Sequence, residues 1–180
     1  MLANAGIPMI FVQYPLMIKA LVPVVIVEAL LIRRWVHLSY RDAFMGVTTA
    51  NLLSTLAGFP LAWVAMFAIE VAFMEPLGLA ADKWHWHFFY SPFFQVVVGM
   101  AWIGPVDQAG YWLVPLAAAL LLIPSFFVSV LLERFICRLA WTSADPAALR
   151  RGVFRANLAS YIVLFVLACG WAGFEFYIHN

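Results

Sequence analysis

The chain has 180 residues, of which 66% are hydrophobic and only 11% charged, whereas soluble domains carry about 25% charged residues. This composition excludes a water-soluble globular protein and indicates a protein that folds in a lipid bilayer. A formal net charge of +1 provides no concentrated basic surface, so we expect no nucleic acid as a partner.

Four apolar stretches are long enough to cross a membrane, which takes about 20 helical residues. They cover residues 9–32, 44–68, 111–132 and 156–176. The first lacks the basic leader of a secretory signal, so we expect it to be retained. The sequence therefore predicts an all-α polytopic membrane protein with four transmembrane helices, forming a single transmembrane domain over residues 1–180.

Prolines lie inside three of these stretches. They are Pro15 and Pro23 in the first, Pro60 in the second and Pro124 in the third. Each proline removes one backbone donor and crowds the preceding turn. We therefore expect kinks or breaks at these positions, and Pro15 is an alternative start for the first helix.

A long connection, residues 71–110, separates the second and third predicted spans. Its one apolar run, residues 93–103, is too short to span the membrane and is typical of a re-entrant or interfacial segment. The connection is also rich in aromatic residues, which favour the headgroup region of a bilayer. We expect it to lie at the outer membrane surface.

The arginines orient the predicted helices. Arg33, Arg34 and Arg41 follow the first span, and Arg134, Arg138, Arg150, Arg151 and Arg155 follow the third. All eight arginines therefore lie on one side, which the positive-inside rule assigns to the cytoplasm. We expect a bacterial inner-membrane protein with both its N-terminus and its C-terminus extracytoplasmic.

The two halves of the chain share a short motif. Residues 46–54 (GVTTANLLS) and residues 152–160 (GVFRANLAS) both read G-V-x-x-A-N-L-x-S. Each copy follows a span that carries a proline and then a glutamate. We interpret the chain as two parallel helical hairpin repeats, about residues 9–70 and 111–177. Chance identity in a sequence rich in Ala, Leu, Gly and Val is the alternative.

Polar side chains at membrane depth form the main candidate site. They are Glu28, Asn51, Ser54, Glu133, Asn157 and Ser160. One interpretation is interhelical hydrogen bonding, a common role of Asn and Ser in membranes. The other is a proton or ion site centred on Glu28, since intramembrane carboxylates are functional candidates. Neutralisation of Glu28 by Arg33 or Arg34 would remove the need for a special role.

A second candidate is a metal site in the connection. His85 and His87 lie two residues apart, so in an extended strand both imidazoles face the same side and can bind one metal ion. All four histidines lie outside the predicted spans, which argues against a membrane haem. The sequence has no nucleotide or flavin motif, and the cofactor is unknown.

These observations support three hypotheses for the function. The first is a non-catalytic accessory or scaffolding subunit of a membrane assembly, because the chain has no catalytic constellation and its helix faces suit contacts with other helices. The second is an oligomeric transporter or channel with a polar site at the repeat interface. The third is an extracytoplasmic metal-binding or redox-partner protein. The expected partners are the lipid bilayer and other membrane subunits or further copies of the chain.

Overall fold

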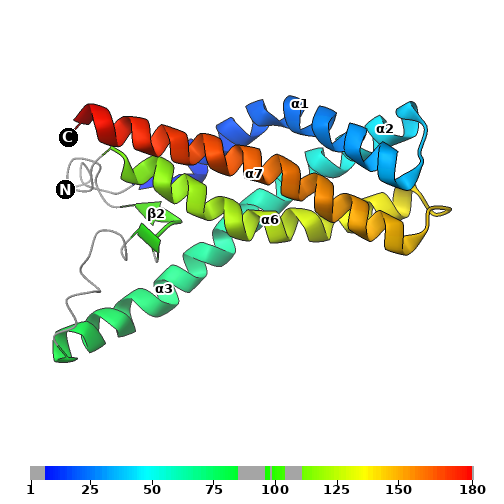
Figure 1. The fold of residues 1–180 in the computed structure, drawn as a ribbon. Coiled ribbons are helices and arrows are strands. Elements are labelled where there is room, and N and C mark those ends of the chain that lie inside the picture. Colours follow the sequence, from blue (N-terminus) through cyan, green and yellow to red (C-terminus); the bar gives the residue numbers. More distant parts are fainter. Residues whose placement is uncertain (1–6, 85–95, 98, 104–110, 180) are drawn as a thin grey trace. The chain divides into compact units, whose positions relative to one another are not determined.

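The computed structural model describes residues 7–84, 96–97, 99–103 and 111–179, and the described chain is almost entirely helical (Figure 1). Its elements are β1 (Ile7–Pro8), α1 (Met9–Val36), α2 (Tyr40–Leu53), the π-helix η2 (Ser54–Gly58), α3 (Phe59–Trp84), β2 (Trp102–Ile103), α6 (Leu113–Ala140) and α7 (Pro146–His179). The prediction of an all-α protein is confirmed.

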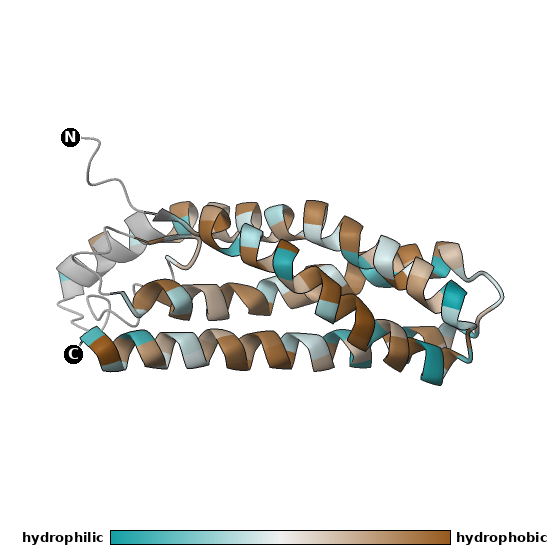
Figure 2. Ribbon diagram, turned by 90° about the horizontal axis from the view of Figure 1, so that it is seen from above, coloured by the Kyte–Doolittle hydropathy of each residue, from teal (hydrophilic) through white to brown (hydrophobic). Residues whose placement is uncertain are grey.

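Four helical segments in the described part of the chain are long and apolar enough to cross a membrane. They are Met9–Val36, Tyr40–Phe73, Leu113–Ala140 and Pro146–His179. Apolar residues dominate along these helices in Figure 2. The apolar side chains exposed along α7, such as Val163 at 57% and Leu167 at 64%, suit a hydrocarbon solvent. The prediction of a multi-pass membrane protein with four spans is confirmed.

The helices extend further than hydropathy alone predicted. At the arginine-bearing ends, α1 continues to Val36 and α7 already begins at Pro146, because arginine is a good helix former even where it is too polar for the membrane core. Residues 71–84, which the sequence assigns to the connection, continue α3 as a helix up to Trp84, and the extracytoplasmic position of the connection stays a prediction. Hydropathy locates the part of a helix that lipid covers and does not locate the helix end.

Two short turns join the helices that bear the arginines. At the first turn, His37 adopts a left-handed conformation with φ 57°, and the Leu38 N–H donates to the Arg33 carbonyl at 3.3 Å, which is a common way to end a helix. Ser39 then accepts from the Asp42 N–H at 3.1 Å and caps α2. Such N-caps satisfy backbone donors that the helix leaves free.

The helix α7 is capped in the same manner. Asp145 precedes it, and Oδ2 of Asp145 accepts a hydrogen bond from the Ala148 N–H at 2.8 Å. An acidic residue at this position also complements the positive end of the helix dipole. Both hairpin turns are thus specified by local sequence.

The prolines do not break the helices. α1 is continuous through Pro15 and Pro23, and α6 is continuous through Pro124. Breaks at these positions, and the alternative start of α1 at Pro15, are therefore wrong, whereas the kinks that the sequence also allowed stay a prediction. Near Pro60 the chain instead forms the π-helix η2, in which the Phe59 N–H donates to the Ser54 carbonyl. Within a bundle, neighbouring groups and local helix adjustments can satisfy the backbone carbonyl that a proline leaves without a donor.

The chain divides into two compact units. The first, which we call the polar-core unit, comprises Tyr14–Ala62 and Pro124–Leu164. The second, which we call the aromatic unit, comprises Met1–Gln13, Trp63–Ile123 and Phe165–Asn180.

The polar-core unit is built on tightly packed small and branched residues. Its apolar cluster contains Val25, Ala29, Ile32, Val47, Ala50, Cys137, Trp141, Leu149, Val153 and Ala156. Gly46 lies directly against the Trp141 ring, where a Cβ atom would clash. At Gly152 a Cβ atom would lie 3.1 Å from a Val36 methyl group. The glycine of each motif copy therefore permits a close helix contact, as small residues do in membranes.

The aromatic unit holds a two-stranded ribbon. β1 pairs antiparallel with β2, with Ile7 opposite Ile103 and Pro8 opposite Trp102. The carbonyl of Ala101 accepts from the Met9 N–H at 3.0 Å and from Nε1 of Trp63 at 2.9 Å. The described end of the apolar run 93–103 is thus a short strand. Residues 93–95 and 98 of that run lie outside the described residues, and its re-entrant or interfacial character stays a prediction.

Candidate functional site

The structure brings six predicted polar residues together inside the polar-core unit. Glu28 comes from α1, Asn51 from α2, Ser54 from η2, Glu133 from α6, and Asn157 and Ser160 from α7. Each is at most 4% exposed, and Glu28 and Asn157 are completely buried. We call these residues the polar cluster.

Glu28 binds one donor from each of two helices. Its Oε2 accepts a hydrogen bond from Nδ2 of Asn51 at 2.7 Å. Its Oε1 accepts from the Ser160 hydroxyl at 2.5 Å. Both carboxyl oxygens are therefore satisfied by side chains of the same protein.

Glu133 is bound in the corresponding way. Its Oε2 accepts from Nδ2 of Asn157 at 2.6 Å, and its Oε1 accepts from the Ser54 hydroxyl at 2.9 Å. Each glutamate thus receives an amide from the helix that follows it in its own hairpin. Each receives its hydroxyl from the other hairpin, so the hydrogen bonds cross between the two.

Local backbone contacts hold the donors in place. Nδ2 of Asn51 also donates to the Val47 carbonyl, and Nδ2 of Asn157 donates to the Val153 carbonyl, each at 3.2 Å. The Ser54 hydroxyl lies 3.1 Å from the carbonyl oxygen of Asn51. A residue bound to the preceding turn loses little further freedom when it contacts the carboxyl group. The motif A-N-L-x-S therefore presents two oriented donors on one helix face.

No basic side chain among the described residues forms an ion pair with the two carboxyl groups. The Arg33 guanidinium carbon lies 3.5 Å from the centre of the Tyr40 ring, and Arg34 is exposed. Within the described ranges, neither Glu28 nor Glu133 forms an ion pair. The ion pair of Glu28 with Arg33 or Arg34 that the sequence allowed is therefore not formed among the described residues. Cation–π stacking on Tyr40 instead holds Arg33 near its helix end.

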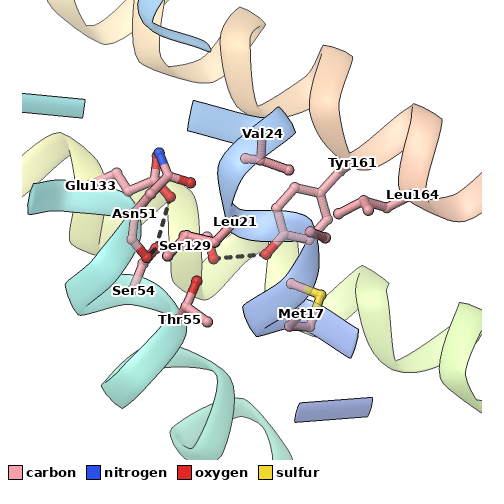
Figure 3. Close-up of a pocket in the computed structure, with 11 residues that line it drawn as sticks. Met17, Leu21, Val24, Asn51, Ser54, Thr55, Ser129, Glu133, Tyr161 and Leu164 are labelled. Atoms are coloured by element: carbon pink, nitrogen blue, oxygen red, sulfur yellow. Dashed lines mark hydrogen bonds between the residues drawn. The ribbon is translucent and has the colours of Figure 1, made fainter. Parts of the chain in front are cut away.

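A small cavity adjoins the cluster (Figure 3). It is lined by polar groups of Asn51, Ser54, Thr55, Ser129, Glu133 and Tyr161 and by the apolar side chains of Met17, Ala20, Leu21, Val24 and Leu164. Its volume is ≈ 10 Å³, about the room that one water molecule needs. Figure 3 shows the Ser129 hydroxyl bonded to the Tyr161 hydroxyl, at 2.7 Å.

Sequence reasoning missed the cavity residues Ser129, Tyr161 and Thr55. A signal for two of them was present. Ser129 lies one helical turn before Glu133 and so shares its face, and Tyr161 directly follows Ser160. Tyr161 was not identified because tyrosine in a span is more often an interfacial anchor than a buried polar group.

The predicted metal pair, His85 and His87, lies outside the described residues. Among the residues that the structure does describe, no group of three His, Cys, Asp or Glu side chains could hold a metal ion. His179 lies 3.3 Å from the Glu175 carboxylate within α7, and Trp171 donates to the same carboxylate at 3.0 Å. The metal site therefore stays a prediction.

The fold and the site define a class of protein. Four apolar helices make the chain a multi-pass membrane protein, and its most distinctive feature is a buried pair of glutamates bound by crossed amide and hydroxyl donors. Comparisons with protein-family models, with curated proteins and with solved structures found no match.

Proposed function

We propose that the chain is a non-catalytic accessory or scaffolding subunit of a membrane assembly. The observation that carries this proposal is the closure of the polar cluster. All four oxygens of Glu28 and Glu133 accept hydrogen bonds from Asn and Ser side chains of the same protein. Polar groups that satisfy one another inside the protein fix the helix arrangement and leave the apolar exterior for lipid and other helices.

We propose the bacterial inner membrane as its location, with the arginine-bearing turns in the cytoplasm. The support is the charge bias, because all eight arginines follow the first or third span and such bias sets orientation. The stacking of Arg33 on Tyr40 and of Arg155 on Trp35, the latter at 5.7 Å, is consistent with an interface at these helix ends.

We also propose that the two hairpins are repeats of one ancestral unit. Corresponding residues of the two motif copies make corresponding contacts: Asn51 and Asn157 each bind the glutamate of their own hairpin. The copies differ at one point, since η2 follows Ser54 whereas α7 is continuous through Ser160. The π-helix is the local adjustment to Pro60, which has no counterpart in the second copy.

A second candidate function is an oligomeric transporter or channel. One observation favours it: Glu133 and the Ser129–Tyr161 pair contribute polar groups to the wall of a small cavity, and intramembrane carboxylates often mark ion or proton pathways. A volume of ≈ 10 Å³ is too small for a pathway in this state. Transport would require a conformational change or an assembly of several chains.

The experiment that separates these functions starts from the native membrane. The chain is expressed at its native level with a small tag, extracted in mild detergent and weighed as an intact complex by native mass spectrometry. We expect a complex of fixed stoichiometry with a different membrane protein, and no ion flux in proteoliposomes that contain the chain alone.

The outcome that contradicts the proposal is equally defined. Complexes that contain only copies of this chain, with a flux in proteoliposomes that Glu28→Gln abolishes, would establish the transporter instead. Glu175→Gln is the matched control, because among the described residues Glu175 bonds to His179 and Trp171 of its own helix, and its removal should leave any such flux unchanged.

A further inference from the structure

We propose that the cavity beside Glu133 binds one small alkali cation, such as sodium. The ligands are oxygen atoms of the Glu133 carboxyl group and of the hydroxyls that surround the cavity. This inference goes beyond the accessory role and does not depend on it, because a subunit without transport activity can still bind an ion.

The first argument is the charge of Glu133. Nδ2 of Asn157 and the Ser54 hydroxyl both donate to its carboxyl group, and donors around a carboxyl group favour its ionised form. Glu133 is buried, and among the described residues it forms no ion pair. A buried anion without a counter-charge is costly. A cation beside Glu133 removes this cost.

The second argument is the set of oxygen atoms on the cavity wall. Besides Glu133, the wall carries the hydroxyls of Ser54, Thr55, Ser129 and Tyr161, and it carries no lysine, arginine or histidine. Hard cations prefer oxygen ligands. A carboxylate offers about four acceptor positions and each hydroxyl has two lone pairs, so oxygens that already form hydrogen bonds can still contact an ion. One carboxylate among neutral hydroxyls matches a single positive charge.

The third argument is the buried hydroxyl of Thr55. This residue is 7% exposed, lies on the cavity wall and has no hydrogen-bond partner among the described residues. Figure 3 shows its hydroxyl turned toward the Ser129–Tyr161 pair. Thr55 also belongs to η2, and π-helical turns often occur at functional sites. A buried hydroxyl without a partner needs explanation, and an ion in the cavity supplies that partner.

The two hairpins differ in a way that places the site at Glu133. The residue four positions before Glu133 is Ser129, whereas the residue four positions before Glu28 is Val24. Both Ser129 and Val24 line the cavity, but Glu28 does not. Residues four apart share a helix face, so the hydroxyl that accompanies Glu133 is replaced by an apolar group beside Glu28. We therefore assign the ion to the second glutamate alone.

The size of the cavity limits the ligand to a single small ion. Its volume is ≈ 10 Å³, about the room that one water molecule needs, and a sodium ion is no larger than a water molecule. A choline ion is several times larger and cannot enter. Choline is therefore a suitable inert cation for comparison with sodium.

The test measures sodium binding to the full chain in mild detergent, with choline chloride used to keep the ionic strength constant at fixed pH. In equilibrium dialysis we expect one radioactive sodium ion to bind per chain. The unfolding temperature should rise as sodium replaces choline, because a ligand stabilises the folded form that binds it. Glu133→Gln should abolish sodium binding, since the site loses its negative charge.

The decisive variant is Thr55→Val, which removes one hydroxyl at nearly constant volume. We expect it to raise the sodium concentration for half saturation by about tenfold or more, the scale on which groups that support metal sites act. Thr49→Val is the matched control, because the Thr49 hydroxyl lies on an exposed face and bonds to the Met45 carbonyl. Its sodium binding should equal that of the wild type.

Three outcomes would overturn the proposal. The first is a wild type that binds no sodium. The second is an unfolding temperature that is the same in sodium and choline, which would show that the cavity holds water alone or that a proton neutralises Glu133. The third is sodium binding that Thr55→Val leaves unchanged, which would place the ion elsewhere. If Glu133→Gln fails to fold, Ser129→Ala and Tyr161→Phe should each weaken sodium binding, and unchanged binding in both contradicts the proposal.

Discussion

The hydroxyl of Ser160 on α7 donates to Oε1 of Glu28 on α1, across 132 residues of sequence. Its counterpart, the bond from Ser54 to Glu133, spans 79 residues. Both bonds join the two hairpins, whereas the bonds from Asn51 and Asn157 lie within one hairpin each. The serines therefore connect the two halves of the polar-core unit, and the asparagines hold each half together.

Removal of one serine hydroxyl should weaken the fold measurably. We expect Ser160→Ala and Ser54→Ala each to lower the free energy of unfolding by about 1 kcal/mol, which lies within the range of interhelical hydrogen bonds in membranes. The measurement is reversible unfolding in mixed detergent micelles. Thr49→Ala is the matched control, because within the described part of the chain the Thr49 hydroxyl bonds to the Met45 carbonyl of its own helix, on an exposed face. An equal loss in the control would contradict the role assigned to the serines.

The crossed arrangement predicts which pairs are energetically coupled. In double-mutant cycles, Glu28→Gln should couple with Ser160→Ala, and Glu133→Gln with Ser54→Ala, each by at least about 0.5 kcal/mol, the usual scale for residues in contact. The exchanged pairs, Glu28 with Ser54 and Glu133 with Ser160, should couple more weakly. Stronger coupling in the exchanged pairs would show that each serine binds the glutamate of its own hairpin.

Much of the fold follows from sequence patterns that depend only on local chemistry. The four spans follow from apolar length. The six polar residues follow from the G-V-x-x-A-N-L-x-S motif and from the rarity of carboxylates at membrane depth. The crossed pairing of Ser160 with Glu28 does not follow, because it depends on how two hairpins far apart in sequence pack. No single-sequence pattern records that packing.

Helix ends and helix irregularities could not be predicted from the sequence either. Hydropathy ends where the lipid ends, so it could not reveal that α3 extends to Trp84. The prolines suggested breaks, yet α1 is continuous through Pro15 and Pro23. Proline removes a single hydrogen bond, and whether the helix breaks there depends on neighbouring groups that the sequence does not identify.

The close contact between Gly46 and Trp141 predicts a steric effect. A Cβ atom at position 46 would overlap the indole ring, so we expect Gly46→Ala to lower the free energy of unfolding by about 1–3 kcal/mol, as overpacking of a filled core does. The loss should be partly recovered by Trp141→Phe, which leaves more room. Gly173→Ala is the control, because nothing lies within 4 Å of a Cβ atom built there, so we expect no loss of stability, since alanine favours a helix more than glycine does.

The orientation of the chain can be tested by cysteine labelling in intact cells. Ser143, in the turn before α7, is exposed, and it lies between the arginine-bearing ends of α6 and α7. We expect Ser143→Cys to react with a membrane-impermeant maleimide only after the membrane is opened, and His179→Cys, at the end of α7, to react from outside. The native Cys137 is buried and should contribute little background. Labelling of Ser143→Cys from outside would contradict the cytoplasmic assignment of this turn.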